Sequence, residues 1–246
     1  MSTPPEPQTW QLVVASVQEV TPNMRRIQLT SPSLDTFEYL PGQDLALGFQ
    51  RDGAGVVRRR YTIRRFDAAR RLLDVDIVMH GDGPGVRWAE AACPGLSIEA
   101  IGPRGKITLA PAADWHLFAG DATAVPGAFA MMEALPARVP AHAYLEVDGP
   151  DERQPLALGH ANKTVTWRYA ENGSPEATGG LLAAISAADV RPGRGYAYLA
   201  GEVVLVSALK AALLHRGWAP DQVSAKAYWN RGRANAGHGE PELKAT

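Results

Sequence analysis

The stretch HLFAGDATAVPGAFAMMEAL, residues 116–135, decides the fold of the second half of the chain. HLFAG is an apolar run typical of a buried strand, and AVPGAFAMMEAL is long enough for a helix. Further strands are predicted at residues 142–147, 163–168, 196–201 and 223–230, and helices at 180–189 and 202–217. Strands that alternate with helices predict a doubly wound α/β fold, a parallel sheet with helices on both faces.

The residues before this stretch show a different pattern, short β-like runs interrupted by Pro, Gly, Asn and Asp. The clearest run is LLDVDIVM, residues 72–79, in which apolar and acidic side chains alternate as in a strand with one buried face. A short helix is predicted at residues 86–93, ended by Pro94-Gly95. Several short strands with one helix predict a small closed antiparallel β-barrel. We therefore expect two domains, a barrel at residues 1–112 and an α/β domain at 113–246.

Composition excludes several classes of protein. Lys and Arg total 25 against 26 Asp and Glu, a net charge of −1, so nucleic acid is not an expected partner. No apolar run approaches the roughly 20 residues of a membrane span, and the N-terminus has no signal-peptide pattern. The single cysteine, Cys93, cannot form an internal disulfide or hold an iron–sulfur cluster, and no metal site is expected. We expect a cytoplasmic monomer in which Cys93 is buried as a packing residue.

Arginine accounts for 20 of the 25 positive charges, and seven arginines lie between Arg58 and Arg71. One interpretation is a solvated strand edge that discourages edge-to-edge pairing. The other concerns Arg59, Tyr61 and Thr62: a guanidinium fork suits phosphate oxygens, a neighbouring aromatic ring offers a stacking surface, and a hydroxyl can donate to a ring nitrogen. That set suits a nucleotide that carries a flat heterocycle.

The segment HGDGPGVRWA, residues 80–89, reads as a strand end, a glycine turn and a helix start. The backbone N–H groups of Gly85 and Val86 would face outward at that helix start, where anions bind. The alternative is an ordinary strand–turn–helix connection. His80 is interpreted either as a buried core histidine or as a ligand contact.

Two loops follow predicted strands of the α/β domain, GDATAVPG at residues 120–127 and AGE at 200–202. Each is compatible with a plain strand–helix loop. Together they would line the carboxyl edge of the sheet, where ligands bind in doubly wound folds.

The sequence resembles the siderophore-interacting protein family, a branch of the ferredoxin–NADP reductase superfamily. The motifs that carry the resemblance appear in family order: RRYTIR (59–64), HGDGPGVRWA (80–89), GPRG (102–105), GDATAVPG (120–127), AGE (200–202) and YWNRGR (228–233). The resemblance implies an FAD-binding barrel, an NAD(P)H-binding α/β domain and the reduction of ferric siderophores.

For the flavin, the resemblance implies that Arg59 binds a phosphate, that Tyr61 lies against the isoalloxazine ring and that Thr62 lies near its N5. Other positions are matched to the family as well. The strand that lines the flavin corresponds to Asp76, Val78 and His80, and the diphosphate-binding turn to Gly85 and Val86.

For the nicotinamide nucleotide, the resemblance implies a loop at Asp121, Thr123 and Ala124 and a second loop at Gly201 and Glu202. Catalytic roles are expected for Tyr61, Thr62 and Asp121. One departure is that Ala122 stands where many members carry Glu.

The reaction implied by the resemblance has two steps: NAD(P)H gives a hydride to FAD, and electrons then pass singly to Fe(III) held by a siderophore. Because siderophore complexes are often anionic, a basic rim is expected, with these candidates: Arg51, Arg58, Arg104 and Lys106. One alternative function is a general NAD(P)H:flavin or electron-transfer reductase with another acceptor. The other is a non-catalytic ferric-siderophore-binding protein.

The choice between NADPH and NADH rests on two segments. The acidic loop DGPDERQ, residues 148–154, would disfavour a 2′-phosphate. Arg168, Arg231 and Arg233 would favour one if they converge at the same sheet edge. We expect NADPH, with Arg168 among the residues that bind it.

Overall fold

A computed structural model describes residues 7–51, 55–156, 162–170, 178–188 and 191–231. The chain divides into two compact units. Residues 1–109 with 129–131 make up the first unit, and residues 110–128 with 132–246 make up the second. Each unit has its own sheet and its own buried core.

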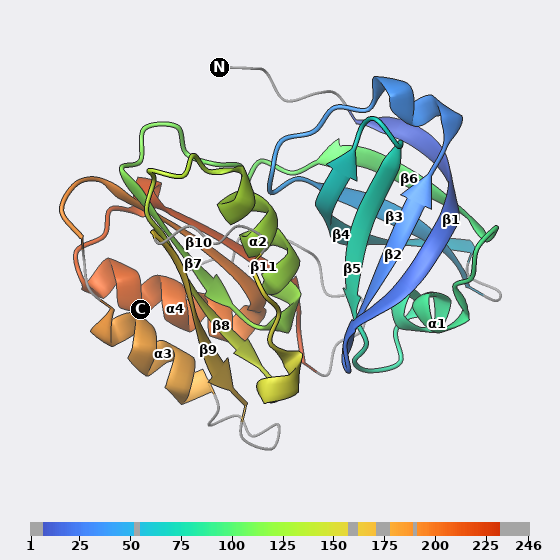
Figure 1. Cartoon of the computed structure of the whole chain (residues 1–246). Helices are drawn as coiled ribbons and strands as arrows, with labels where there is room; N and C mark the ends of the chain where they lie inside the picture. Colours follow the sequence, from blue (N-terminus) through green and yellow to red (C-terminus); the bar gives the residue numbers. More distant parts are fainter. Residues whose placement is uncertain (1–6, 52–54, 157–161, 171–177, 189–190, 232–246) are drawn as a thin grey trace. The chain divides into compact units, whose positions relative to one another are not determined.

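The first unit is a closed barrel of six antiparallel strands among the described residues (Figure 1). Its order is β1-β2-β5-β4-β3-β6. The strands are β1 (Gln8–Thr21), β2 (Met24–Thr30), β3 (Asp44–Arg51), β4 (Gly55–Asp67), β5 (Leu72–Val78) and β6 (Ser97–Arg104). A 3₁₀ helix, Pro32–Thr36, links β2 to β3. The predicted antiparallel barrel is confirmed.

The alternation in β5 explains how the barrel closes around its core. Leu73, Val75 and Ile77 are buried in the apolar core of the barrel. The intervening Asp74 and Asp76 point to the opposite face, yet they are also buried, because arginine side chains cover them. The strand is thus apolar on one side and ionic on the other.

The predicted short helix is α1 (Pro84–Ala91). It starts two residues earlier than expected because Pro84 occupies the first turn, where a missing N–H costs no hydrogen bond. Trp88 and Ala89 pack against the barrel core. Cys93 lies beyond the helix end and is exposed, so the prediction that it is buried is wrong.

The second unit is a five-stranded parallel sheet in the order β11-β10-β7-β8-β9. The strands are β7 (Trp115–Gly120), β8 (Ala141–Val147), β9 (Lys163–Tyr169), β10 (Gly195–Glu202) and β11 (Val223–Trp229). The helices are α2 (Val125–Ala134), α3 (Thr178–Ala187) and α4 (Val203–His215), with 3₁₀ turns at Ala122–Ala124, Pro150–Glu152 and Pro220–Gln222. Figure 1 shows α2 on one face of the sheet and α3 with α4 on the other, which confirms the doubly wound α/β fold.

The strand order reverses between β7 and β10, so the chain leaves these two neighbouring strands toward opposite sides of the sheet. This is a topological switch point, and the carboxyl ends of the strands around it form the edge where such folds bind ligands. Among the described residues, no helix combines the length and apolar character needed to cross a membrane.

Candidate functional site

Two of the predicted motifs meet in the first unit, at Tyr61 on β4 and Gly85 in the first turn of α1. A β-carbon built on Gly85 would lie 1.9 Å from the Tyr61 hydroxyl oxygen and 3.6 Å from the ring of Phe49. Tyr61 and Phe49 make an edge-on ring contact with centroids 6.2 Å apart. Only a glycine lets the helix start approach this ring, so residue 85 positions α1 against β4.

The first turn of α1 leaves backbone donors available to an anion. Gly83 is the N-cap and makes no side-chain capping hydrogen bond. Because the first N–H groups of a helix have no partner within it, those of Gly85 and Val86 suit a phosphate oxygen. Asp82, just outside the turn, pairs instead with Arg87, whose Nη1 donates to its carboxylate over 2.7 Å.

Arg59 lies on the same face of β4 as Tyr61, two residues away. Its Nη1 donates to the Arg58 carbonyl oxygen over 2.8 Å. Burial raises the pKa of Tyr61 to about 12, although the Arg59 charge lowers it, so the phenol stays protonated at neutral pH. The first unit therefore contains the Arg59 cation, the neutral Tyr61 hydroxyl and the start of α1.

Thr62 lies on the opposite face of β4 from Arg59 and Tyr61. It is buried and pairs in register with Asp44 on β3. Arg60, on the same face as Thr62, makes a two-pronged ion pair with Asp44, with both N···O distances 2.7 Å. The structure therefore places Thr62 beside a buried ion pair.

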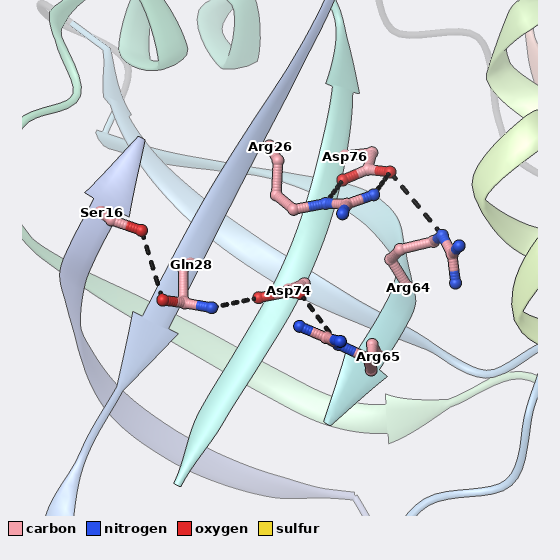
Figure 2. A network of polar contacts seen from close by, with 7 residues as sticks. All are labelled: Ser16, Arg26, Gln28, Arg64, Arg65, Asp74 and Asp76. Atoms are coloured by element: carbon pink, nitrogen blue, oxygen red, sulfur yellow. Dashed lines mark hydrogen bonds and ion pairs between the residues drawn. The ribbon is translucent and has the colours of Figure 1, made fainter. Parts of the chain in front are cut away.

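Asp76 is a buried carboxylate at the centre of an ionic network on the outer face of the barrel, which Figure 2 shows from close by. Arg26 donates to both carboxylate oxygens, over 2.7 and 2.8 Å, and Arg64 Nε lies 4.0 Å from Oδ2. The neighbouring Asp74 accepts a hydrogen bond from Gln28 and pairs with Arg65 at 3.4 Å. This carboxylate pair supports strands β2, β4 and β5.

The remaining predicted flavin contacts lie at the end of β5. Val78 is the last residue of the strand, is half-buried and pairs with Met24. His80 is exposed in the following turn, so the interpretation of His80 as a buried core histidine is wrong. Of the basic rim candidates, Arg58 pairs with Glu99, Arg104 and Lys106 are exposed, and Arg51 ends β3.

In the second unit, Asp121 ties the strand ends at the switch point together. Its Oδ1 accepts hydrogen bonds from the backbone N–H and the hydroxyl of Thr123, over 2.9 and 2.5 Å. Its Oδ2 accepts from the N–H of Glu202 and from the indole N–H of Trp229, over 2.7 and 2.9 Å. One carboxylate thus joins the ends of β7, β10 and β11.

The Glu202 carboxylate joins the start of α4 to the C-terminal segment in a similar way. Its Oε2 accepts hydrogen bonds from the N–H groups of Val204 and Leu205, over 2.5 and 3.1 Å. Its Oε1 accepts from the N–H of Arg231 over 3.3 Å. Gly201 has a φ of +133°, and a β-carbon there would lie 2.6 Å from Asp121 Oδ2. The two predicted loops therefore meet, as expected for one edge of the sheet.

The other predicted residues of this edge lie in two places. Thr123 and Ala124 form the 3₁₀ turn that Asp121 caps. Arg168 is exposed at the end of β9 and pairs in register with Glu146 on β8. Arg231 is the last described residue of the C-terminal segment, and Arg233 lies outside the described residues.

Glu146 was not expected from the sequence. It lies near the carboxyl end of β8, one register step beyond the pair Gly120 and Leu145, and so next to Asp121. Its position in the strand HAYLEV carries the only sequence signal, a polar side chain at the end of a parallel strand. Its side chain is half-buried with Oε2 fully covered, and this depends on residues from other strands, which the local pattern does not contain.

Two family models match the chain. The siderophore-interacting protein model matches residues 113–232, and the siderophore-interacting FAD-binding domain model matches residues 46–107. A ferric vibriobactin reductase of Vibrio cholerae is 31% identical over 87% of this chain and 86% of its own length.

This chain belongs to the siderophore-interacting protein family.

Further relatives agree with this membership. An uncharacterized protein of Mycobacterium tuberculosis is 33% identical over 89% of each chain. A siderophore utilization protein from T. fusca has a crystal structure that aligns with a TM-score of 0.87 at 30% identity, over 96% of this chain and 98% of that one. A ferredoxin NADP⁺ reductase from Neisseria gonorrhoeae shares the fold at 17% identity and a TM-score of 0.69.

The family model assigns FAD binding to the barrel, and the donors found there fit that cofactor. A diphosphate needs cationic and N–H donors, which Arg59 and the uncapped first turn of α1 provide. A flat ring needs an aromatic neighbour, which Tyr61 provides. The siderophore-interacting protein family and the geometry of the barrel thus agree on the cofactor.

Proposed function

We propose that this siderophore-interacting protein is an NAD(P)H-dependent flavoprotein that reduces ferric siderophores and thereby releases ferrous iron. In this proposal residues 1–112 are the FAD domain and residues 113–246 are the nicotinamide nucleotide domain. The observation that carries it is the contact between Tyr61 and the start of α1 at Gly85, inside the matched FAD-binding domain. The relative named as a ferric vibriobactin reductase supports the choice of substrate.

FAD supplies the redox chemistry when it is bound, because its ring takes up two electrons as hydride and releases them one at a time. No protein nucleophile is required. One nicotinamide nucleotide then accounts for two ferric ions reduced. Siderophores hold Fe(III) through hard oxygen donors far better than Fe(II), so reduction favours release.

The side chains of the barrel bind and orient the cofactor in this proposal. Arg59 and the N–H groups of Gly85 and Val86 bind the diphosphate, and Tyr61 lies against the ring as a neutral phenol. Thr62, Val78 and His80 complete the surroundings of the flavin. Asp76 holds Arg26 and thereby the strand pair on which these residues lie.

The second unit binds the nicotinamide nucleotide at the carboxyl edge of its sheet. Asp121 and Glu202 organise that edge through hydrogen bonds to backbone N–H groups and to Trp229. We propose NADPH as the preferred nucleotide, with the exposed Arg168 at its 2′-phosphate. The acidic residues at 148–152 are then directed away from that phosphate.

The test is an anaerobic titration of the purified yellow protein. Bleaching of the flavin absorbance by NADPH or NADH, followed by reoxidation with a ferric siderophore, supports the proposal. Ferric catecholate and hydroxamate chelates are compared with quinones and free flavin as acceptors. Equal rates with all acceptors indicate a general reductase, and a colourless protein that binds ferric siderophore indicates a non-catalytic binding protein; either result overturns the proposal.

A further inference from the structure

Three carboxyl groups lie at the switch-point edge of the second unit, and one of them differs from the other two. Both oxygens of Asp121 and both oxygens of Glu202 accept hydrogen bonds from N–H or hydroxyl donors. Glu146 Oε2, in contrast, is buried and makes no hydrogen bond. A buried polar atom without a partner is costly, so it is expected to have a role that the free protein does not satisfy.

The charges that face Glu146 come from four segments. Asp121 follows β7, Asp148 follows β8, and Arg231 follows β11, and all three act on Glu146 electrostatically. Arg168 is its register partner on β9. Burial raises the pKa of Glu146 to about 7; Asp121 and Asp148 also raise it, and Arg231 lowers it. The group is therefore poised between its neutral and charged forms near neutral pH.

We propose that Glu146 is a nucleotide-binding residue that, in its protonated form, donates a hydrogen bond to a nicotinamide dinucleotide bound at this edge. The inference rests on the proposed function, since it takes the dinucleotide to be the ligand of this sheet edge. It adds a residue and a protonation state to that site.

The chemistry of the ligand favours the neutral form. A dinucleotide carries negative charge on its diphosphate and presents acceptor oxygens. An ionised Glu146 beside Asp121 would repel these groups, whereas a neutral carboxylic acid supplies the proton that an acceptor needs. Nucleotide binding is then coupled to proton uptake at Glu146, because the ligand binds the protonated form better.

This coupling determines how the nucleotide affinity changes with pH. Below about pH 7 Glu146 is already neutral, and the nucleotide binds without taking up a proton. Above that pH it must first be protonated. Binding of only the neutral form predicts affinity about tenfold weaker at pH 8 than at pH 6, with uptake of about one proton per nucleotide at pH 8.

The experiment is calorimetric titration of the FAD-loaded protein with NAD⁺, which has no group that titrates between pH 6 and 8, and with NADP⁺. Each titration is done at both pH values and in two buffers of different ionisation enthalpy, so that protons taken up are counted. Glu146→Gln, a neutral mimic that keeps an N–H donor, should bind NAD⁺ equally well at pH 6 and 8 and take up no proton. Glu146→Ala should bind more weakly at both pH values.

Glu38→Gln is the matched control, because it makes the same change at an exposed glutamate of the first unit and should behave as wild type. Nucleotide binding that shows the same pH dependence and proton count in wild type and Glu146→Gln overturns the role of Glu146 while leaving the proposed function intact. If neither NAD⁺ nor NADP⁺ binds at any pH, both the inference and the proposed function are wrong.

Discussion

A β-carbon on Gly85 would lie 1.9 Å from the hydroxyl oxygen of Tyr61, far closer than any real contact between such atoms. The helix start and the tyrosine ring therefore fit together only because residue 85 has no side chain. Two motifs that are 24 residues apart in the chain depend on each other at this one contact.

Gly85→Ala is expected to lower both FAD retention and stability. The added methyl group must push Tyr61 or α1 aside, and overpacking of this kind costs about 1–3 kcal/mol. The measurement is the FAD-to-protein absorbance ratio with a thermal melt. Gly83→Ala is the control, since a β-carbon there meets nothing within 4 Å. Adding Tyr61→Phe, which removes the nearest atom, should restore part of the lost stability; wild-type FAD content in Gly85→Ala alone would contradict the assigned contact.

Arg59→Ala is expected to weaken FAD binding by about tenfold or more, because a charge-assisted phosphate contact contributes roughly 1.5–3 kcal/mol. Equilibrium dialysis or fluorescence titration of the apoprotein measures this. Arg58→Ala is the matched control on the same strand, as Arg58 faces the other way and pairs with Glu99. Equal FAD affinity in the Arg59 variant and wild type would remove Arg59 from the flavin site.

Asp76→Asn is expected to destabilise the barrel by about 3–5 kcal/mol, because it leaves the Arg26 guanidinium without its buried counter-charge. Chemical denaturation of the FAD-free protein isolates this effect from cofactor binding. Asp82→Asn is the control: its ion pair with Arg87 is exposed, so less than about 1 kcal/mol is expected. Similar small losses in both variants would mean that the network in Figure 2 does not support the barrel.

Arg168→Ala is expected to lower kcat/KM for NADPH by about tenfold or more and to leave kcat/KM for NADH unchanged, since only NADPH carries the 2′-phosphate. Steady-state kinetics at low salt measure both. Arg153→Ala, an exposed arginine that donates to the Pro150 carbonyl, serves as the control. A wild-type kcat/KM for NADH equal to or above that for NADPH would reverse the expected preference.

Cys93→Ala is expected to leave flavin reduction and stability unchanged, because the side chain is exposed and packs in no core. The native protein should react with one equivalent of a thiol reagent per chain, without unfolding. A thiol that reacts only in denaturant would show that Cys93 is covered in solution.

The sequence predicts the elements of this fold well because its alternation is local. Leu73, Val75 and Ile77 repeat every second residue, and the structure buries all three in the barrel core. The same alternation predicts which way Asp74 and Asp76 point. It does not predict their burial, because the arginines that cover them come from β2 and β4, distant in the chain.

The candidate site is predictable to a similar degree. Glycines in a turn before Pro84 indicate a helix start, and the structure has α1 there. The opposite orientation of Thr62 also follows from alternation, but its neighbour Asp44 comes from β3. Glu146 escapes prediction because its environment is assembled from the ends of three other segments, which only the folded sheet brings together.

The four hydrogen bonds at Asp121 indicate which residues of this sheet edge must be kept in engineered variants and which can be changed. The Asp121 side chain joins the ends of β7, β10 and β11, so changing it would disturb three segments at once. These hydrogen bonds do not involve the described residues at the ends of β8 and β9, such as Glu146 and Arg168. Libraries designed to alter the proposed nucleotide preference can therefore randomise these two strand ends and keep Asp121 with its hydrogen-bond partners unchanged.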